Sequence, residues 1–368
     1  MTKPDADAAA MRLLHHRTAA LAVGDPVAEP LVATSTFRLG DGDPAPDAIY
    51  GRYATANVEA AEGRLAHVEG APCILFPAGM GAIGATMLAC AGAGDRVVVP
   101  SDGYMHSRVV LRDILAPLGV EGVEVPTLDL PDADLDGVAL VLAETPSNPG
   151  LDVIDVAALA ERCRAAGTRL AVDNTFCTGF LQRPLDLGAD VVVSADTKAA
   201  GGHSDLILGH AATRDAALGD RLRAIRKFMG MIPGPFEAWM LSRSLETLEV
   251  RLDRMCANAA AVVASMAEAG LPVSWPGLPS HPQHALAMRQ MRDPGYVFGV
   301  TLPDRATAMR FLDRSGILSA TSFGGTHTSA DRRGRWGDAV PEGYLRISAG
   351  IEPTGPLLDA VRRGMAAL

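Results

Sequence analysis

Short apolar runs and longer amphipathic stretches alternate through the middle of the chain. Five of the runs predict β-strands, at 96–100, 139–144, 169–174, 190–195 and 206–213. They are continuously apolar and do not alternate, so we expect helices to cover both faces of their sheet. The stretches between them predict helices, at 58–70, 107–119 and 155–167. Strands that alternate with helices favour an α/β fold with a mainly parallel sheet.

The two ends of the chain have different patterns. The N-terminal 50 residues are rich in Pro, Asp and Ala with weak periodicity, which predicts an arm and not a domain. One long helical stretch covers 235–269, and 297–302 and 344–349 alternate like strands of a half-exposed sheet. The predicted division is therefore an N-terminal arm, a large domain and a smaller C-terminal α+β domain, over 1–50, 51–235 and 236–368.

Composition narrows the class of protein. The net charge of −10 over 368 residues argues against nucleic-acid binding, which needs clustered Lys and Arg. Five cysteines without a CxxC pair fit neither a disulfide framework nor a zinc site, so no metal is predicted. The first residues include acidic side chains and lack the apolar core of a signal peptide, so we expect a cytoplasmic protein.

Residues 74–94 carry no charge and are long enough to span a bilayer. The segment is dominated by Gly and Ala and contains Pro77. A buried, tightly packed helix explains this composition better, so no membrane segment is predicted.

Reactive side chains follow three of the predicted strands in turn: Asn148, then Asp173, then Thr197 with Lys198. Ligands of open α/β sheets bind outside the carboxyl ends of the strands, so we expect these groups to converge on one rim. Small neighbours would partly desolvate Lys198 and make its neutral amine available for chemistry. The alternative is a surface lysine at a strand end.

Other residues near this rim allow two interpretations each. Asp173 could cap a helix, or it could pair with a protonated ring nitrogen of a cofactor. Gly79 and Met80 lie where a strand turns into a helix, which favours a phosphate, although no nucleotide motif is present. Tyr104 could stack on a flat cofactor or form a turn. Arg346 could bind an amino-acid carboxylate or lie on the surface of an edge strand.

Nine motifs in register resemble the Cys/Met metabolism PLP-dependent family, which includes cystathionine γ-lyase, cystathionine γ-synthase and methionine γ-lyase. The resemblance runs from about residue 31 to residue 352, through YGRY, FPAGMGAI, SDGY, ETPSNP, VDNTF…LQRPLDLGAD, SADTKAAGGHSD, IPGPFEAWMLSRSLETLEVR, TSFGG and YLRISAGIE. It implies pyridoxal 5'-phosphate (PLP) as the cofactor and a small-molecule amino acid as the substrate. It also implies a large domain of the PLP-dependent transferase type (fold type I).

The resemblance also implies roles for individual residues. Lys198 matches the Schiff-base lysine, Asp173 its pyridinium partner, and Tyr104 the tyrosine that stacks on the ring. The other cofactor contacts implied are Gly79, Met80, Asn148, Thr175, Ser194 and Thr197. The substrate contacts implied are Arg346, Ser322, Asn148 and Thr321. Tyr50 and Arg52 match a pair that reaches the cofactor phosphate of a neighbouring subunit, which implies a homodimer at minimum and usually a tetramer.

The sequence departs from the family pattern near the substrate. Met105-His106-Ser107 replaces the common Gly-Gly-Thr after the stacking tyrosine, and Ala199 replaces the tyrosine after the lysine. Thr321 stands where many cystathionine-handling members carry a glutamate. A distal ammonium would lose a charge partner there, which weakens the case for cystathionine itself.

The resemblance favours a carbon–sulfur lyase of the cystathionine γ-lyase type, which releases a 2-oxo acid, ammonia and a thiol. The same residues would serve a γ-replacement transferase (cystathionine γ-synthase or O-acylhomoserine sulfhydrylase), a methionine γ-lyase or a cystathionine β-lyase. The alternative of a different class is a non-enzymatic phosphate-ligand binder on the same scaffold. Lys198, Asp173 and Tyr104 together argue against that alternative.

Overall fold

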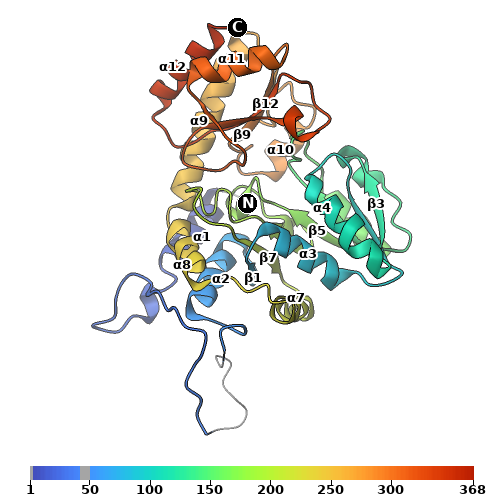
Figure 1. The fold of residues 1–368 in the computed structure, drawn as a ribbon, viewed down its shortest axis with the longest axis vertical. Coiled ribbons are helices and arrows are strands. Elements are labelled where there is room, and N and C mark those ends of the chain that lie inside the picture. The colour runs from blue at the N-terminus through green and yellow to red at the C-terminus, as the bar shows by residue number, and fades with distance from the viewer. Residues whose placement is uncertain (1–2, 42–49) are drawn as a thin grey trace.

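A computed structural model describes residues 3–41 and 50–368 of the chain. Its largest element is a seven-stranded sheet (Figure 1). In spatial order the strands are β1 (Cys73–Phe76), β7 (Gly209–Thr213), β6 (Val191–Ser194), β5 (Arg169–Asp173), β4 (Val138–Glu144), β2 (Arg96–Pro100) and β3 (Glu121–Val125). β7 runs antiparallel to β1 and β6, and the other neighbours are parallel. The predicted α/β fold with a mainly parallel sheet is confirmed.

Both faces of this sheet are buried. Ile74 and Phe76 of β1 pack into one apolar cluster, whereas Cys73 and Leu75 of the same strand enter another. The surrounding helices are α2 (Ala56–Glu69), α3 (Gly79–Cys90), α4 (Met105–Val109), α5 (Val156–Ala166), α6 (Thr178–Leu181) and α7 (Ala216–Phe228). Successive side chains of a strand point to opposite faces, so a strand covered on both sides must be apolar throughout. The continuous apolar runs of the sequence have this cause.

Some predicted elements have different limits in the structure. The predicted helix 107–119 is observed as α4, followed by a π-helical turn at Val110–Leu115 and a 3-10 turn at Ala116–Leu118. The strand predicted at 206–213 begins only at Gly209, because Leu206–Leu208 belong to the connection from Lys198. The uncharged segment 74–94 folds as part of β1 and as α3. Within 3–41 and 50–368, every helix is too short or too polar to cross a membrane.

A second, five-stranded sheet lies in the C-terminal part of the chain. Its order is β10 (Leu318–Ser319), β11 (Ser329–Arg332), β12 (Tyr344–Ser348), β9 (Val297–Thr301) and β8 (Val273–Ser274). The expected half-exposed sheet is wrong for β12, which is buried at every position. One face of β12 packs into the apolar cluster through Leu345 and Ile347. On its other face Arg346 contacts Asn148 of the larger part of the molecule.

The C-terminal helices differ from the sequence prediction in one respect. They are α8 (Pro235–Leu245), α9 (Leu248–Glu268), α10 (His284–Gln290), α11 (Arg305–Ser315) and α12 (Thr354–Met365). The stretch predicted to be helical over 235–269 is helical, but a turn at Glu246 and Thr247 divides it into α8 and α9. α8 lies beside α2, and α9 continues into the C-terminal part (Figure 1).

Within residues 3–41, the N-terminal segment forms α1 (Lys3–Leu14) and a short 3-10 turn at Thr18–Ala20. Ala6, Ala9 and Leu13 recur at helical spacing and are buried against the core that includes α2. Parts of the chain beyond α1 extend away from the body (Figure 1). Other parts contact it: the Glu29 carbonyl accepts from Trp239 Nε1 at 2.7 Å, and the Val32 N–H donates to Asn57 at 2.8 Å. The boundaries predicted near residues 50 and 235 stay a prediction.

Candidate active site

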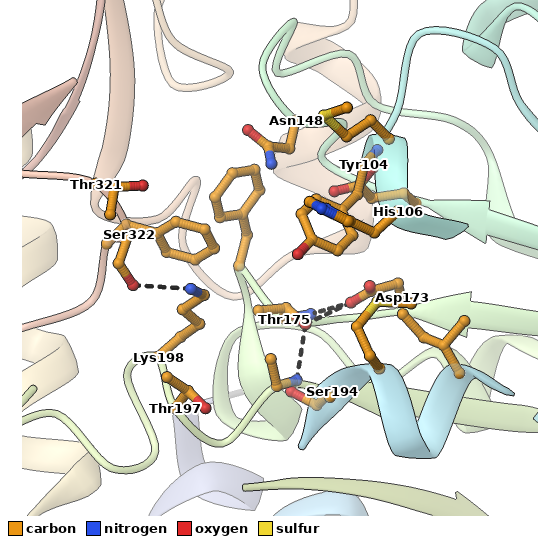
Figure 2. A pocket seen from close by; sticks show the side chains of 18 of the residues that line it. Tyr104, His106, Asn148, Asp173, Thr175, Ser194, Thr197, Lys198, Thr321 and Ser322 are labelled. Carbon is orange, nitrogen blue, oxygen red and sulfur yellow. Dashed lines mark hydrogen bonds between the residues drawn. The ribbon is translucent and has the colours of Figure 1, made fainter. Parts of the chain in front are cut away.

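A cavity of about 340 Å³ opens at the carboxyl ends of β4, β5 and β6. The larger sheet contributes one wall and loops of the C-terminal part contribute the other (Figure 2). All sequence-predicted site residues line it except Tyr50 and Arg52. They are Gly79, Met80, Tyr104, Asn148, Asp173, Thr175, Ser194, Thr197, Lys198, Thr321, Ser322 and Arg346.

Lys198 is held in a tight turn after β6. Its backbone N–H donates to the Ala195 carbonyl at 3.1 Å, and its own carbonyl accepts from Gly202 at 2.7 Å. The Nζ atom donates to Ser322 Oγ at 2.8 Å (Figure 2). It lies 5.1 Å from the centre of the Phe323 ring. Burial and then the nearby Arg346 charge lower the pKa of Lys198 to about 8, although Asp173 opposes them. The surface-lysine interpretation is therefore wrong, and the amine is partly neutral near pH 8.

Asp173 ends β5 beside the same cavity. Its Oδ1 accepts hydrogen bonds from the backbone N–H of Thr175, at 3.0 Å, and from the Thr175 hydroxyl. That hydroxyl in turn accepts from the backbone N–H of Ala195 at 2.9 Å (Figure 2). The helix-cap interpretation is wrong, because the N-cap of the next helix, α6, is Cys177. Asp173 is instead tied to the turn that carries Lys198.

The pKa of Asp173 is set by opposing effects. Burial raises this pKa, the two hydrogen bonds from Thr175 lower it, and the positive charges of Lys198 and His210 lower it further. The net direction is upward. The carboxylate therefore depends on nearby donors and cations to stay ionised.

Glu144 is a site residue that sequence reasoning missed. It ends β4 and its Oε2 accepts the backbone N–H of Tyr104 at 2.8 Å. A Cβ on Gly103 would lie 2.7 Å from that same oxygen and 3.0 Å from Pro100, so the turn packs closely against Glu144. Burial, and then the charge of Asp173, raise the pKa of Glu144 well above its usual value. An acid at the carboxyl end of a predicted strand was the signal that could have revealed it.

Tyr104 and His106 form part of the wall near Asn148. Their ring centres are 5.1 Å apart, and both rings lie near the cavity (Figure 2). Burial, and then the charges of Asp173 and Glu144, raise the pKa of the Tyr104 phenol. The phenol therefore keeps its proton at neutral pH.

Arg346 reaches the cavity from β12, the central strand of the C-terminal sheet. Its Nη1 donates to Asn148 Oδ1 at 2.7 Å and its Nη2 to the Ser322 carbonyl at 2.9 Å. The residue is only 3% exposed, so the surface interpretation is wrong. Burial, and then the charge of Arg333, lower its pKa to about 10. The guanidinium nevertheless stays charged at neutral pH.

The first turn of α3 closes one end of the cavity. Its N-cap, Ala78, has no side chain that could satisfy the helix amides. A Cβ on Gly79 would lie 2.7 Å from the Cβ of Ala195, so the helix end packs closely against the Lys198 turn. Thr197 Oγ1 is bonded to the backbone of Leu208, at 3.1 and 3.2 Å. The free amides of a helix start favour an anion here.

Two further residues of the cavity wall were not predicted from the sequence. Arg333 and Trp336 come from a 3-10 turn at Arg333–Trp336, far along the chain from the strand ends. Trp336 Nε1 donates to Asp331 at 2.9 Å, and Arg333 pairs with Asp331 at 3.0 Å and with Asp338 at 2.6 Å. No local pattern marks these residues, because only the packing of the two sheets brings them to the cavity.

Tyr50 and Arg52 do not line the cavity of their own chain. Tyr50 is 42% exposed, and the Arg52 guanidinium lies 5.4 Å from the centre of its ring. Their predicted role concerns a neighbouring subunit and stays a prediction.

Comparison with known proteins gives consistent matches along most of the chain. The sequence model of "Cys/Met metabolism PLP-dependent enzyme" matches residues 12–366. A Streptomyces coelicolor protein named "Putative cystathionine gamma-lyase" is 43% identical over 88% of this chain and 85% of its own length. The L-methionine gamma-lyase of Pseudomonas deceptionensis is 33% identical over 97% of both chains. The crystal structure of cystathionine gamma synthase from Xanthomonas oryzae in complex with cystathionine superposes with a TM-score of 0.92, at 31% identity over 98% of this chain and 99% of that one.

Proposed function

This chain belongs to the Cys/Met metabolism PLP-dependent enzyme family, and we propose that within this family it is a carbon–sulfur lyase of the cystathionine γ-lyase type. It is an enzyme, and pyridoxal phosphate is the cofactor of its family. The observation that carries the finer assignment is the 43% identity to the Streptomyces coelicolor relative, against 33% to the methionine gamma-lyase. The reaction would release a 2-oxo acid, ammonia and a thiol.

The residues of the cavity fit the cofactor of the family. Among the described residues, Asp173 accepts hydrogen bonds from Thr175 only, which leaves carboxylate capacity for a protonated ring nitrogen. The uncapped first turn of α3, at Gly79 and Met80, suits the phosphate. Lys198 supplies the amine that would hold the aldehyde. Tyr104 would lie against the ring, and Ser194 and Thr197 line the phosphate side.

Bound pyridoxal phosphate supplies an electron sink that stabilises negative charge at the substrate Cα. Asp173 would keep the ring nitrogen protonated by accepting its hydrogen bond. Lys198 Nζ would take the proton from Cα as a general base, and its lowered pKa suits that task. Ser322 Oγ, at 2.8 Å, would orient the amine.

Two further groups would handle the ends of the substrate. Arg346 would bind the α-carboxylate through its planar guanidinium, which Asn148 and the Ser322 carbonyl hold in place. The Tyr104 hydroxyl, which keeps its proton at neutral pH, would donate it to the departing sulfur. Lys198 would thus act as the general base and Tyr104 as the general acid.

A γ-replacement transferase is the second candidate. The solved cystathionine gamma synthase with 31% identity favours it, and the same residues would serve both reactions. A methionine γ-lyase and a cystathionine β-lyase remain further alternatives. Thr321 replaces the glutamate of many cystathionine-handling members, which favours substrates without a distal ammonium.

We also propose that the active unit is at least a dimer, and that the full assembly is a tetramer. The partner's Tyr50 and the partner's Arg52 would then complete the phosphate end of the site. Both residues are exposed in the single chain and neither lines its own cavity, which supports this proposal. We further propose a cytoplasmic location.

The function is tested by product analysis. Purified protein is incubated with cystathionine, methionine or an O-acylhomoserine, with and without added thiol, and 2-oxobutanoate, pyruvate, ammonia and any newly formed sulfur amino acid are measured. A lyase of the proposed type forms 2-oxobutanoate from cystathionine without added thiol. Product that requires both an O-acylhomoserine and a thiol would assign the transferase, and pyruvate would assign the β-lyase.

The role of Lys198 has a matched control in this chain. The only other lysines are Lys3 and Lys227. Borohydride reduction should fix the cofactor to Lys198 alone, as peptide mapping would show. Lys198→Ala should lower kcat by roughly 10²- to 10⁴-fold, whereas Lys3→Ala, at an exposed salt bridge, should leave it unchanged. Full activity of Lys198→Ala would contradict the proposed mechanism.

A further inference from the structure

Three ionisable side chains that the proposed mechanism does not use are buried together near the Lys198 turn. His210 on β7, Asp196 after β6 and Glu69 at the end of α2 are each at most 2% exposed. His210 Nδ1 lies 2.9 and 3.1 Å from the two carboxylate oxygens of Asp196. Its Nε2 lies 3.6 Å from Glu69 Oε1, an ion-pair distance. We call these three residues the His210 cluster.

The two carboxylates around the imidazole of this cluster favour its protonated, positively charged form. Burial lowers the pKa of His210, but Asp196 and Glu69 more than offset it and raise that pKa to about 10. A buried cation needs such partners, because desolvation without them would remove the charge. Glu69 is fixed independently, since its Oε1 also accepts the backbone N–H of Gly179 at 3.0 Å.

The cluster is joined directly to the turn that carries Lys198. Asp196 is two residues before Lys198, and its carbonyl accepts the backbone N–H of Gly201 at 2.7 Å. The backbone N–H of Thr197 donates to Leu208 at 3.2 Å, two residues before His210. Backbone hydrogen bonds and the Asp196–His210 side-chain pair therefore hold the Lys198 turn against the segment at 208–210. Of these contacts, the Asp196–His210 pair is the charged one.

The charge of His210 also reaches Asp173. Asp173 pairs with Val193 across β5 and β6, Val193 pairs with Ala211 across β6 and β7, and His210 precedes Ala211. Two strand spacings are roughly 10 Å, and the His210 side chain points to the opposite face of the sheet from Asp173. Both groups are buried, so no bulk water lies between them to screen the charge. His210 and Lys198 are the two cations that favour the ionised form of Asp173. Lys198 must gain and lose a proton during the proposed reaction, whereas His210 takes no part in that proton transfer.

We propose that His210 is a positioning residue for the active site: clamped by Asp196 and Glu69, it fixes the Lys198 turn and supplies the permanent positive charge that keeps Asp173 ionised. The inference rests on one part of the proposed function, namely that pyridoxal phosphate binds in the cavity. Its consequence is that the ring nitrogen stays protonated even when Lys198 is neutral.

The test replaces the cation by a neutral group of similar reach. In His210→Asn the side-chain amide can still donate to Asp196, so mainly the charge is lost. The protein is loaded with pyridoxal phosphate labelled with ¹⁵N in the ring, and the ¹⁵N signal is recorded by NMR. We expect the signal to move from the protonated toward the unprotonated position. We also expect kcat to fall about tenfold while KM changes less than twofold, because Arg346 is untouched.

Glu62→Gln is the matched control. Glu62 forms a partly buried ion pair with Arg226 and accepts the backbone N–H of Leu75, away from the cavity lining. We expect this variant to lose thermal stability but to keep the wild-type ring signal and kcat. A purely structural role for His210 would make the two variants alike, and an unchanged ring signal in folded His210→Asn would overturn the proposal.

A measurement on the wild-type protein covers the case in which His210→Asn does not fold. In the ¹⁵N spectrum of histidine rings, one imidazole, assigned to His210, should stay doubly protonated up to pH 9. Loss of charge by every imidazole at pH 8 would overturn the proposal. If borohydride fixes no cofactor to Lys198 in the wild type, the proposed function fails, and that result is distinct from an unchanged His210→Asn signal.

Discussion

At the scale of single residues, the site is organised by buried charges that lack water. Arg346 is held by two neutral acceptors, Asn148 and the Ser322 carbonyl, and not by a carboxylate. Its charge is therefore available to an anionic ligand, at the cost of a lowered pKa. Lys198 shares this environment, because Arg346 is one of the reasons that its pKa falls to about 8.

Arg346→Lys should weaken substrate binding selectively. An ammonium cannot reproduce the planar fork, and hydrogen bonds to charged groups contribute about 1.5–3 kcal/mol each. We expect KM to rise roughly 10- to 150-fold with a smaller change in kcat, measured by steady-state kinetics. Thermal unfolding serves as the control for folding. An unchanged KM in a stable variant would show that the carboxylate binds elsewhere.

At the scale of elements, the ends of helices and strands place the chemistry. Glu144 and Asp173 are the last residues of β4 and β5, and Lys198 comes shortly after β6. These strands end at one rim of the sheet, and α3 begins at the same rim. The helices on the outer faces mainly stabilise these strands. Changes at their remote ends should therefore affect stability without affecting the site.

Asp155→Ala tests this separation on α5. Asp155 is the N-cap, and its side chain accepts the backbone N–H of Ala158 at 3.0 Å. Loss of such a cap costs about 1 kcal/mol, so we expect a lower melting temperature and unchanged kcat. Asp155→Asn keeps the cap but loses the exposed ion pair with Arg289, and should stay close to wild type in melting temperature. A loss of kcat in Asp155→Ala would contradict the separation.

At the scale of the whole molecule, the proposed dimer makes a prediction about shared sites. Lys198→Ala and Arg52→Ala homodimers should both be poorly active. In a mixed dimer, one site would combine a native Lys198 with the partner's Arg52, which is also native. Half of the dimers re-formed from equal amounts are mixed and each has one native site, so about a quarter of wild-type activity should return.

The readout is activity after the two variants are mixed, unfolded together and refolded. Each variant refolded alone is the control. Activity that stays at the level of the separate variants would mean that each chain completes its own site, and the proposed contribution of Arg52 would be withdrawn.

The local sequence was sufficient for much of the larger sheet and for the reactive groups at its rim. Strand runs such as 139–144 are apolar throughout because both faces are covered, and this pattern is visible without the fold. Lys198, Asp173 and Asn148 follow such runs directly, so parallel topology alone predicts that they meet. The break between α8 and α9 was missed, because Glu246 and Thr247 interrupt no local periodicity.

The sequence by itself therefore determined the fold class, the family and the residues that follow each strand, because these depend on short-range periodicity and motifs. Tertiary structure alone decided which distant groups surround them. Glu69, Asp196 and His210 belong to different elements, and only packing turns them into one buried cluster. Arg333 and Trp336 reach the cavity for the same reason. Contacts between remote segments form when helices and strands bury their faces against one another. No local sequence pattern indicates which elements will pack together.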